Sequence, residues 1–202
     1  MLERFFPQSG SIELLCCDVD LKADLDVFCD AHELPFADES FQAIVITAVL
    51  QHVLNPQMVT KEMFRVLSVG GLVYSEVAFM QQVCEGAYDF TRYSLSGHRV
   101  LLSQFRELSA GIVAGPATAM VWSIENLFLS AVERRWLRVG MKAIVRVVFS
   151  WLKYLDYLLQ HRRGAADGAS CTYFLGVKDS EARNKEQRII DNYIGAKHLR
   201  HV

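Results

Sequence analysis

The chain has 202 residues, of which 51% are hydrophobic and 22% charged. This balance suits one globular domain with a continuous core and excludes a disordered chain or a small disulfide-stapled one. The net charge of −2 gives no overall field that would attract nucleic acid, so we expect no nucleic-acid partner.

Five cysteines are an odd number, and none of them has the Cys-x-x-Cys spacing of metal sites. We therefore predict reduced thiols and no metal site. The N-terminus lacks the apolar stretch of a signal peptide, and no apolar run reaches the roughly 18 residues that a membrane-spanning helix needs. These features predict a cytoplasmic protein without a transmembrane segment. Four of the cysteines fall in apolar runs and are expected to be buried: Cys16, Cys17, Cys29 and Cys171.

The first part of the chain is rich in predicted strands. Short apolar runs at residues 12–17 and 25–29 are each followed by acids, as at the ends of strands. A turn-rich link at residues 34–40 leads to a nearly unbroken apolar run at residues 41–49. Such a run is typical of a strand that is buried on both faces.

A helix and a further strand follow. Asn55 and Pro56 open a helix that runs from about Gln57 to Leu67, with its apolar residues on one side. A Gly-Gly pair ends it, and residues 72–77 return as a strand. Strand, helix and strand in this order form a βαβ unit, so the sheet is predicted to be mostly parallel.

Residues 80–105 form a polar and aromatic zone that ends in a short helix from about Leu95. Loops at the carboxyl ends of parallel strands are where α/β proteins place their ligands. Asp89, Arg92 and Tyr93 combine an acid, a bidentate donor and an aromatic hydroxyl in this loop. Two interpretations remain open: these residues select a substrate, or they lock the loop to the sheet.

The last part of the chain alternates strand, helix and strand and then becomes charged. We predict one domain over residues 1–178 and a charged, largely helical tail over residues 179–202. Within the domain, a helical insertion at about residues 116–165 separates the last two strands. The expected elements are a strand at 111–114, a helical region at 119–161, a strand at 171–177 and a tail helix near 186–193.

The helical insertion has an amphipathic pattern. Seven apolar residues recur at spacings of four and three along residues 135–158, and basic residues fall on a different face. The simplest interpretation is a core-packing helix with a solvated cationic face. Peripheral contact with a membrane surface, or pairing in a homodimer, are the alternatives. The apolar seam is Leu137, Met141, Ile144, Val148, Trp151, Leu155 and Leu158, and the basic residues are Arg135, Arg138, Lys142, Arg146 and Lys153.

Three motifs in the first half resemble one family. The segment CDAHELPFADESF at residues 29–41 looks like the adenine-binding strand and following link of class I S-adenosylmethionine-dependent methyltransferases of the type 11 kind. LQHV at residues 50–53 is similar to the family's LEHV, with Gln51 in place of Glu. EMFRVLSVGG at residues 62–71 resembles its E-x-x-RVLKPGG. The resemblance implies a Rossmann-like α/β fold and methyl transfer from S-adenosylmethionine to an unidentified acceptor.

The resemblance also implies roles for individual residues. Asp18, with Asp20 as an alternative, is positioned to accept the ribose hydroxyls, and Asp30 with the backbone N–H of Ala31 to bind the adenine. Leu34 would help to wall the ring. From the residues alone, the acids are better explained as turn residues that end strands, whereas the resemblance favours the binding roles. Thr47 and His52 lie where the family faces the methyl group and the acceptor, and His52 is the candidate catalytic residue.

The chain departs from the family at its beginning. Only eleven residues precede Ile12, and they contain one glycine, where the family has a first strand and a glycine-rich loop. A truncated chain, a degenerate substitute loop and a sheet closed around the gap are the three explanations. The resemblance therefore covers the adenosine half of the site. The alternative function is a methyltransferase-like binding or scaffold protein that engages a membrane surface or a protein partner without catalysis.

Overall fold

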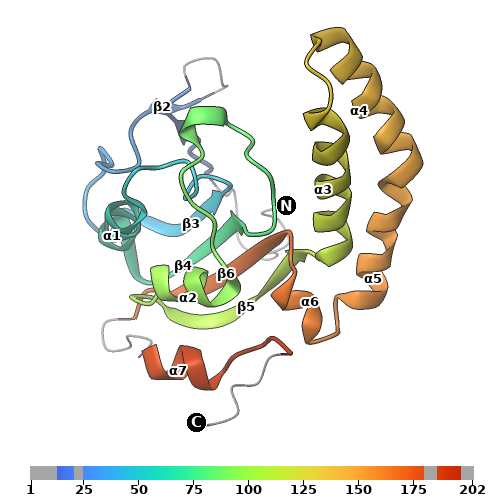
Figure 1. The fold of residues 1–202 in the computed structure, drawn as a ribbon. Helices are drawn as coiled ribbons and strands as arrows, with labels where there is room; N and C mark the ends of the chain where they lie inside the picture. The colour runs from blue at the N-terminus through green and yellow to red at the C-terminus, as the bar shows by residue number, and fades with distance from the viewer. Residues whose placement is uncertain (1–12, 21–24, 180–185, 197–202) are drawn as a thin grey trace.

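The structure, a computed structural model, describes residues 13–20, 25–179 and 186–196. Its centre is a four-stranded sheet in the order β3-β4-β6-β5 (Figure 1). Strands β3, β4 and β5 run in one direction, and β6 is antiparallel to both of its neighbours. The predicted α/β fold, a mostly parallel sheet with an antiparallel pair at the C-terminal end, is confirmed. The strands are β3 Phe41–Thr47, β4 Leu67–Ala78, β5 Arg106–Ala114 and β6 Cys171–Val177.

Strands β1 (Cys17–Asp18) and β2 (Val27–Phe28) form a separate parallel pair. They coincide with the runs predicted at residues 12–17 and 25–29 but are shorter, and residue 12 lies outside the described part. Among the described residues, β3 pairs with β4 alone, so its other edge has no strand beside it.

Helices α1 (Pro56–Val66) and α2 (Leu95–Leu101) contact the sheet and enclose the core with it. The Asn55 side chain caps α1 by accepting a hydrogen bond from the Met58 N–H at 3.1 Å. Val45 and Thr47 on β3 are exposed, so the prediction that residues 41–49 are buried on both faces is wrong. The core consists of Leu50, Val59, Met63, Leu67, Val73, Val77, Leu102, Phe105 and Phe174.

The turn from α1 into β4 differs from the prediction. Strand β4 begins at Leu67, directly after the helix, and the Gly70-Gly71 pair lies inside the strand rather than between two elements. Gly70 has a φ of +80°, a conformation that favours glycine. The pairing register between β3 and β4 shifts in the same region, as at a β-bulge.

The helix α2 carries a buried histidine against the sheet. His98 has no exposed surface, and its ring nitrogens contact the hydroxyls of Ser75 on β4 at 2.9 Å and Thr172 on β6 at 3.2 Å. Burial lowers the pKa of His98 from 6.5 to about 3, so the ring is neutral at physiological pH.

A set of helices lies between β5 and β6, as the predicted fold requires. Figure 1 shows α3 and α4 as a hairpin that stands to one side of the sheet. The carboxylate of Asp156, in α5, accepts hydrogen bonds from the N–H groups of Ala117 at 2.8 Å and Thr118 at 2.9 Å, and so caps α3. The elements are α3 Pro116–Ser130, α4 Arg135–Phe149, η3 Ser150–Tyr154, α5 Leu155–Leu159 and α6 Gly164–Asp167.

The predicted apolar seam over residues 135–158 is neither continuous nor buried. The segment is interrupted by η3, and most of the seam is exposed, whereas Val145, which is not part of the seam, is buried. The prediction of a core-packing helix is therefore wrong, whereas the five basic residues are exposed, as predicted for a solvated cationic face. The side chains of Lys142 and Arg146 also reach toward Glu125 on α3.

Two short helices complete the described part, η2 (Gly86–Tyr88) and α7 (Glu186–Asp191). Arg99 of α2 holds the segment of α7 by donating to the carbonyls of Ile189 and Asn192. Among the described residues, no helix is both long and apolar enough to cross a membrane.

All five cysteines are free thiols, but the expectation of burial is wrong for Cys16 and Cys17, which are exposed. The short pair β1–β2 explains this, because nothing described covers that pair. Cys29 and Cys171 are partly buried, and Cys84 is exposed.

Candidate active site

Two aspartates mark the carboxyl ends of the neighbouring strands β1 and β2. Asp18 uses one carboxylate oxygen, Oδ1, to accept the N–H groups of Val19 at 2.6 Å and Asp20 at 3.1 Å. Asp30 uses Oδ1 to accept the N–H and the Nδ1–H of His32, at 2.9 and 2.6 Å. In both residues, Oδ2 has no hydrogen bond to the described residues. Each acid therefore shapes its own turn through one oxygen, and its other oxygen has acceptor capacity left within the described part of the chain.

His32 joins the end of β2 to the start of α1. Its Nδ1–H donates to Asp30, and its Nε2 accepts the N–H of Asn55 at 3.2 Å, which fixes the ring as the Nδ1–H tautomer. The hydrogen bonds from His32 lower the pKa of Asp30 below its ordinary value. Asp30 is therefore a charged acceptor at neutral pH, as recognition of an amino group requires.

Arg65 fixes the link that follows Asp30. Its guanidinium donates to the carbonyls of Leu34 at 2.9 Å and Phe36 at 2.8 Å, and to the carboxylate of Asp38 at 2.7 Å. Glu62 binds the same guanidinium and also accepts the Leu34 N–H at 3.0 Å. The E-x-x-R motif on α1 therefore binds both the N–H and the carbonyl of Leu34, the residue predicted to wall the adenine site.

His52 lies after the end of β3 and faces the loop that follows β4. Its Nδ1 donates to the Tyr88 carbonyl at 2.9 Å, because a carbonyl can only accept. Its Nε2 is therefore the lone-pair nitrogen, and it lies 3.6 Å from the sulfur of Cys84. The Cys84 sulfur is also 3.6 Å from Asp89 Oδ2. Thr47, at the end of β3, is exposed.

Asp89 and Arg92 bind each other. The Arg92 guanidinium spans both oxygens of the Asp89 carboxylate, whose side chain is fully buried. It also donates to the carbonyls of Gln81 at 3.2 Å and Gln82 at 3.0 Å. The pKa of Asp89 is held well below its usual range by Arg92. This geometry favours the interpretation in which the pair locks the loop. Tyr93 packs against the core cluster.

His52, Cys84 and Asp89 bring a nitrogen, a sulfur and an oxygen within 4.8 Å of one another. Such a donor set suits a transition metal. However, Arg92 already occupies both carboxylate oxygens, and the Cys84 N–H donates to Oδ2 at 2.9 Å. We therefore assign the cluster to the loop rather than to a cation.

Two buried polar atoms near the end of β3 have no partner in the described part of the chain. They are Oε1 of Gln51, a residue that is only 2% exposed, and Oγ1 of Thr91. The two residues are adjacent, since the Thr91 N–H donates to the Gln51 carbonyl at 3.3 Å. Unpartnered buried acceptors of this kind are expected where a ligand or an ordered water completes a site.

Sequence reasoning did not identify the roles of Cys84, His32 and the Glu62–Arg65 pair. The motif contains this pair, but its contacts with residues 34–38 can be seen only in the folded chain. Cys84 has no spacing signal, because its partner His52 is 32 residues away.

Comparisons with known proteins agree with the motifs. Residues 13–75 match the family model described as methyltransferase domain. Over this segment the chain is related to methyltransferases. The ubiquinone/menaquinone biosynthesis C-methyltransferase of Neisseria meningitidis serogroup C is 37% identical over 67 residues, which are 33% of this chain and 27% of that protein. The protein of the same name from Xanthomonas oryzae is 37% identical over 73 residues, 34% of this chain and 28% of its own length.

This chain thus spans about a quarter of the length of these curated relatives. A solved complex of the Haloferax volcanii Trm112 methyltransferase activator with a putative methyltransferase matches with a TM-score of 0.48 and 15% identity. That match covers 78% of this chain and 65% of the other. The methyltransferase segment includes both aspartates, the Arg65 clamp and strand β3.

Proposed function

We propose that this protein transfers a methyl group from S-adenosylmethionine to an acceptor. One observation carries the proposal. Asp18 and Asp30, inside the methyltransferase segment, end two neighbouring parallel strands, and each keeps its Oδ2 open. Two carboxylate oxygens at adjacent strand ends suit the hydroxyls and the amino group of an adenosine.

The residues present fit the adenosine part of the cofactor. Asp18 would accept the ribose hydroxyls, Asp30 the adenine amino group, and the Ala31 N–H would donate to a ring nitrogen. No described residue accepts a hydrogen bond from that N–H. Leu34, held by Arg65, would wall the ring. The described residues do not include a glycine-rich loop for the methionine part, so we assign no residue to it.

The acceptor side lies after β3. When bound, the cofactor supplies an activated methyl group, so the chain's main task is to orient the acceptor. His52 Nε2 carries a lone pair and would take a proton from the acceptor, while Thr47 lies at the end of the same strand. Gln51 and Thr91 offer buried oxygens that an acceptor would satisfy.

The chemical identity of the acceptor is not part of the proposal. Ubiquinone and menaquinone biosynthesis is named for the bacterial relatives alone. This chain covers only about a quarter of their length. Asp89, Arg92 and Tyr93 would shape the loop beside the acceptor rather than bind it directly. We propose the cytoplasm as the compartment, since the cysteines are free thiols.

Calorimetric titration of the 202-residue chain with S-adenosylmethionine tests the proposal. We expect binding in the micromolar range. Asp30→Asn should weaken it about tenfold, because one charged hydrogen bond is lost. The matched control is Glu33→Gln, which changes an exposed neighbouring acid and should leave the affinity unchanged. No heat of binding with a folded chain would contradict the proposal and favour a non-catalytic scaffold.

A further inference from the structure

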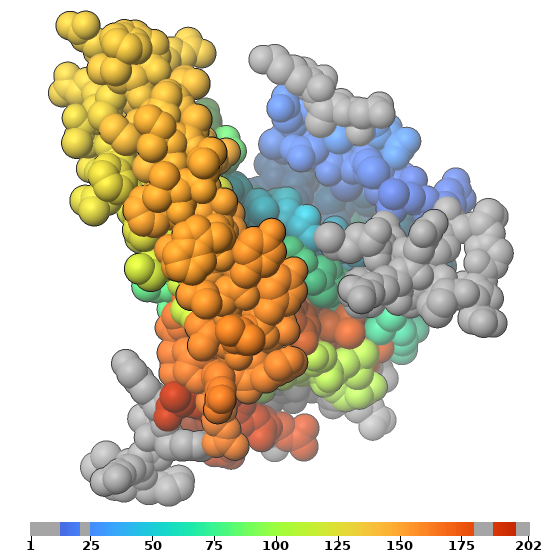
Figure 2. Space-filling view, turned by 90° about the vertical axis from the view of Figure 1, so that its right-hand side faces the viewer, coloured from blue at the N-terminus to red at the C-terminus, as the bar shows by residue number. Residues whose placement is uncertain are grey.

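The outer face of the helical hairpin is apolar and open to solvent. Val147 is 81% exposed and Trp136 67%, whereas Val145, which faces the hairpin interior, is 2% exposed. Figure 2 looks directly at this face, where α4 and α5 form a continuous column. A single exposed apolar residue needs no explanation, but a contiguous patch does. The exposed residues of this outer face include Trp136, Val139, Ile144, Val147, Val148, Trp151, Tyr154, Tyr157 and Leu158.

A cluster of charged side chains lies between α3 and α4, beside apolar contacts such as Phe128 with Phe149. Glu125 of α3 is buried and binds Arg146 at 2.9 Å, with Lys142 at 3.8 Å. Arg146 and Lys153 lie over the ring of Trp122, at 5.9 and 5.1 Å from its centre. A hollow of about 450 Å³ between α3, α4 and η3 is lined by Val121, Trp122, Glu125, Arg146, Val147, Ser150 and Lys153. Lys142 and Arg146 thus lie on the side of α4 that faces α3, with side chains that are about half exposed, while a large apolar surface of α4 faces outward.

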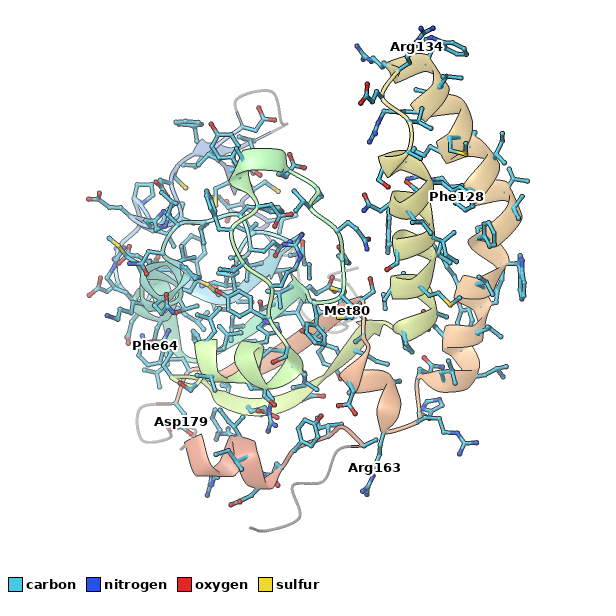
Figure 3. All side chains as sticks on the ribbon, viewed as in Figure 1. Phe64, Met80, Phe128, Arg134, Arg163 and Asp179 are labelled. Atoms are coloured by element: carbon cyan, nitrogen blue, oxygen red, sulfur yellow. The ribbon has the colours of Figure 1, made fainter. Side chains whose placement is uncertain are left out.

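The charge of this segment is one-sided. Residues 134–163 contain eight Arg and Lys residues and a single acid, Asp156. The carboxylate of Asp156 already accepts hydrogen bonds at the start of α3. Glu125, the nearby acid on α3, is buried and pairs with Lys142 and Arg146. Figure 3 shows Arg134 at the free tip of the hairpin and Arg163 at the opposite end of this segment, beside α6. An occupant of this surface must therefore be apolar and negatively charged at the same time.

We propose that the outer face of α4, η3 and α5 docks on an anionic lipid bilayer. An interfacial helix places an apolar face into the boundary between headgroups and acyl chains and keeps cations at the headgroups. Trp136, Trp151 and Tyr154 are the residue types that prefer this boundary. Each cation near an anionic surface adds to the attraction. The proposal concerns attachment only and does not depend on methyl transfer.

An anionic bilayer accounts for the excess of cations in residues 134–163 better than a second copy of the chain would. Two copies facing each other through this surface would bring the same cations together. An anionic headgroup layer instead neutralises them, while the aromatic side chains enter the boundary. The bilayer also accounts for the absence of any acid on the exposed side of residues 134–163.

The three tryptophans of the chain, Trp122, Trp136 and Trp151, lie in α3, α4 and η3, so intrinsic fluorescence reports directly on this helical region. The experiment is titration of the full chain with phosphatidylcholine vesicles, with and without phosphatidylserine, together with co-sedimentation. We expect a blue shift and sedimentation with the anionic vesicles, both reduced by salt. Val147→Asp should abolish both effects. Met58→Asp, at an exposed position on α1, is the matched control and should retain them.

Circular dichroism of each variant verifies that the hairpin remains folded. Arg134→Gln with Arg135→Gln should weaken binding to anionic vesicles and leave weak binding to neutral ones unchanged. Two results would overturn the proposal. One is a folded chain that shows neither a blue shift nor sedimentation with anionic vesicles. The other is a dimer in light scattering whose tryptophans are already shielded and whose dissociation requires Val147→Asp.

Discussion

The guanidinium of Arg65 meets both carboxylate oxygens of Glu62, through Nε at 2.9 Å and Nη2 at 2.7 Å. The two residues are one helical turn apart on α1, so the pair would form in the isolated helix as well. What the fold adds is the link after β2, whose carbonyls complete the coordination of the guanidinium. The motif therefore connects the helix to the candidate adenosine site.

Arg65→Lys should loosen this link, because a lysine cannot donate to the carbonyls of Leu34 and Phe36 and to two carboxylates at once. We expect a lower urea midpoint with an unchanged m-value, and weaker binding of S-adenosylmethionine. Lys61→Arg, at a solvent-exposed position on the same helix, should change neither quantity. Equal effects of the two substitutions would show that the link does not depend on Arg65.

His98 should make the stability depend on pH. Burial lowers its folded pKa from 6.5 to about 3, so between these values the unfolded chain binds a proton that the folded chain does not. The free energy of unfolding should therefore fall as the pH drops from 6.5 toward 3, by up to about 1.4 kcal/mol per pH unit. Above about pH 5 most carboxyl groups no longer titrate, and there His98→Gln should flatten the slope. A variant with the wild-type slope would contradict this assignment.

Asp156→Ala should release the start of α3 from α5. The aspartate accepts hydrogen bonds from three backbone N–H groups and from the Thr118 hydroxyl. Loss of such a cap costs about 2 kcal/mol at most. Limited proteolysis should cut the hairpin faster, while the sheet stays protected. Asp156→Asn keeps one oxygen as an acceptor and is expected to fall between the variant and the wild type.

The rate at which Cys84 is alkylated should depend on the negative charge of Asp89. Partial burial and the nearby Asp89 raise the pKa of Cys84, and Arg92 opposes this. Asp89→Asn should therefore speed the reaction of Cys84 with iodoacetamide at neutral pH, measured by peptide mapping against Cys171 as internal standard. Arg92→Gln loosens the same loop but keeps the acid. If it speeds the reaction as much as Asp89→Asn does, loop opening rather than charge is the cause.

The sequence predicted the order of the main elements because its periodicity is local. Strand β3, helix α1 and strand β6 follow from short apolar runs and from the Asn55 cap. The positions of Asp18 and Asp30 at strand ends followed from the same runs. The roles assigned to the site residues stay predictions.

Other features depend on contacts that no local pattern contains. The local sequence around His98 does not indicate that its ring is buried. The ring contacts Ser75 and Thr172, which lie on two strands that are far apart in the chain. The inverted orientation of α4 was also missed. Its seam at spacings of three and four predicted burial, but Glu125, a buried acid on the neighbouring helix, binds Lys142 and Arg146 and so turns that side of α4 toward α3.

The edge of β3 that lacks a strand among the described residues is a template for self-association. No strand among the described residues pairs with the backbone groups of this edge, and Val45 on the same strand is apolar and exposed. Concentrated samples should therefore be prone to cross-β aggregation that starts at this edge. A short peptide with alternating apolar residues, supplied in excess, would compete for the edge and act as a solubilising additive.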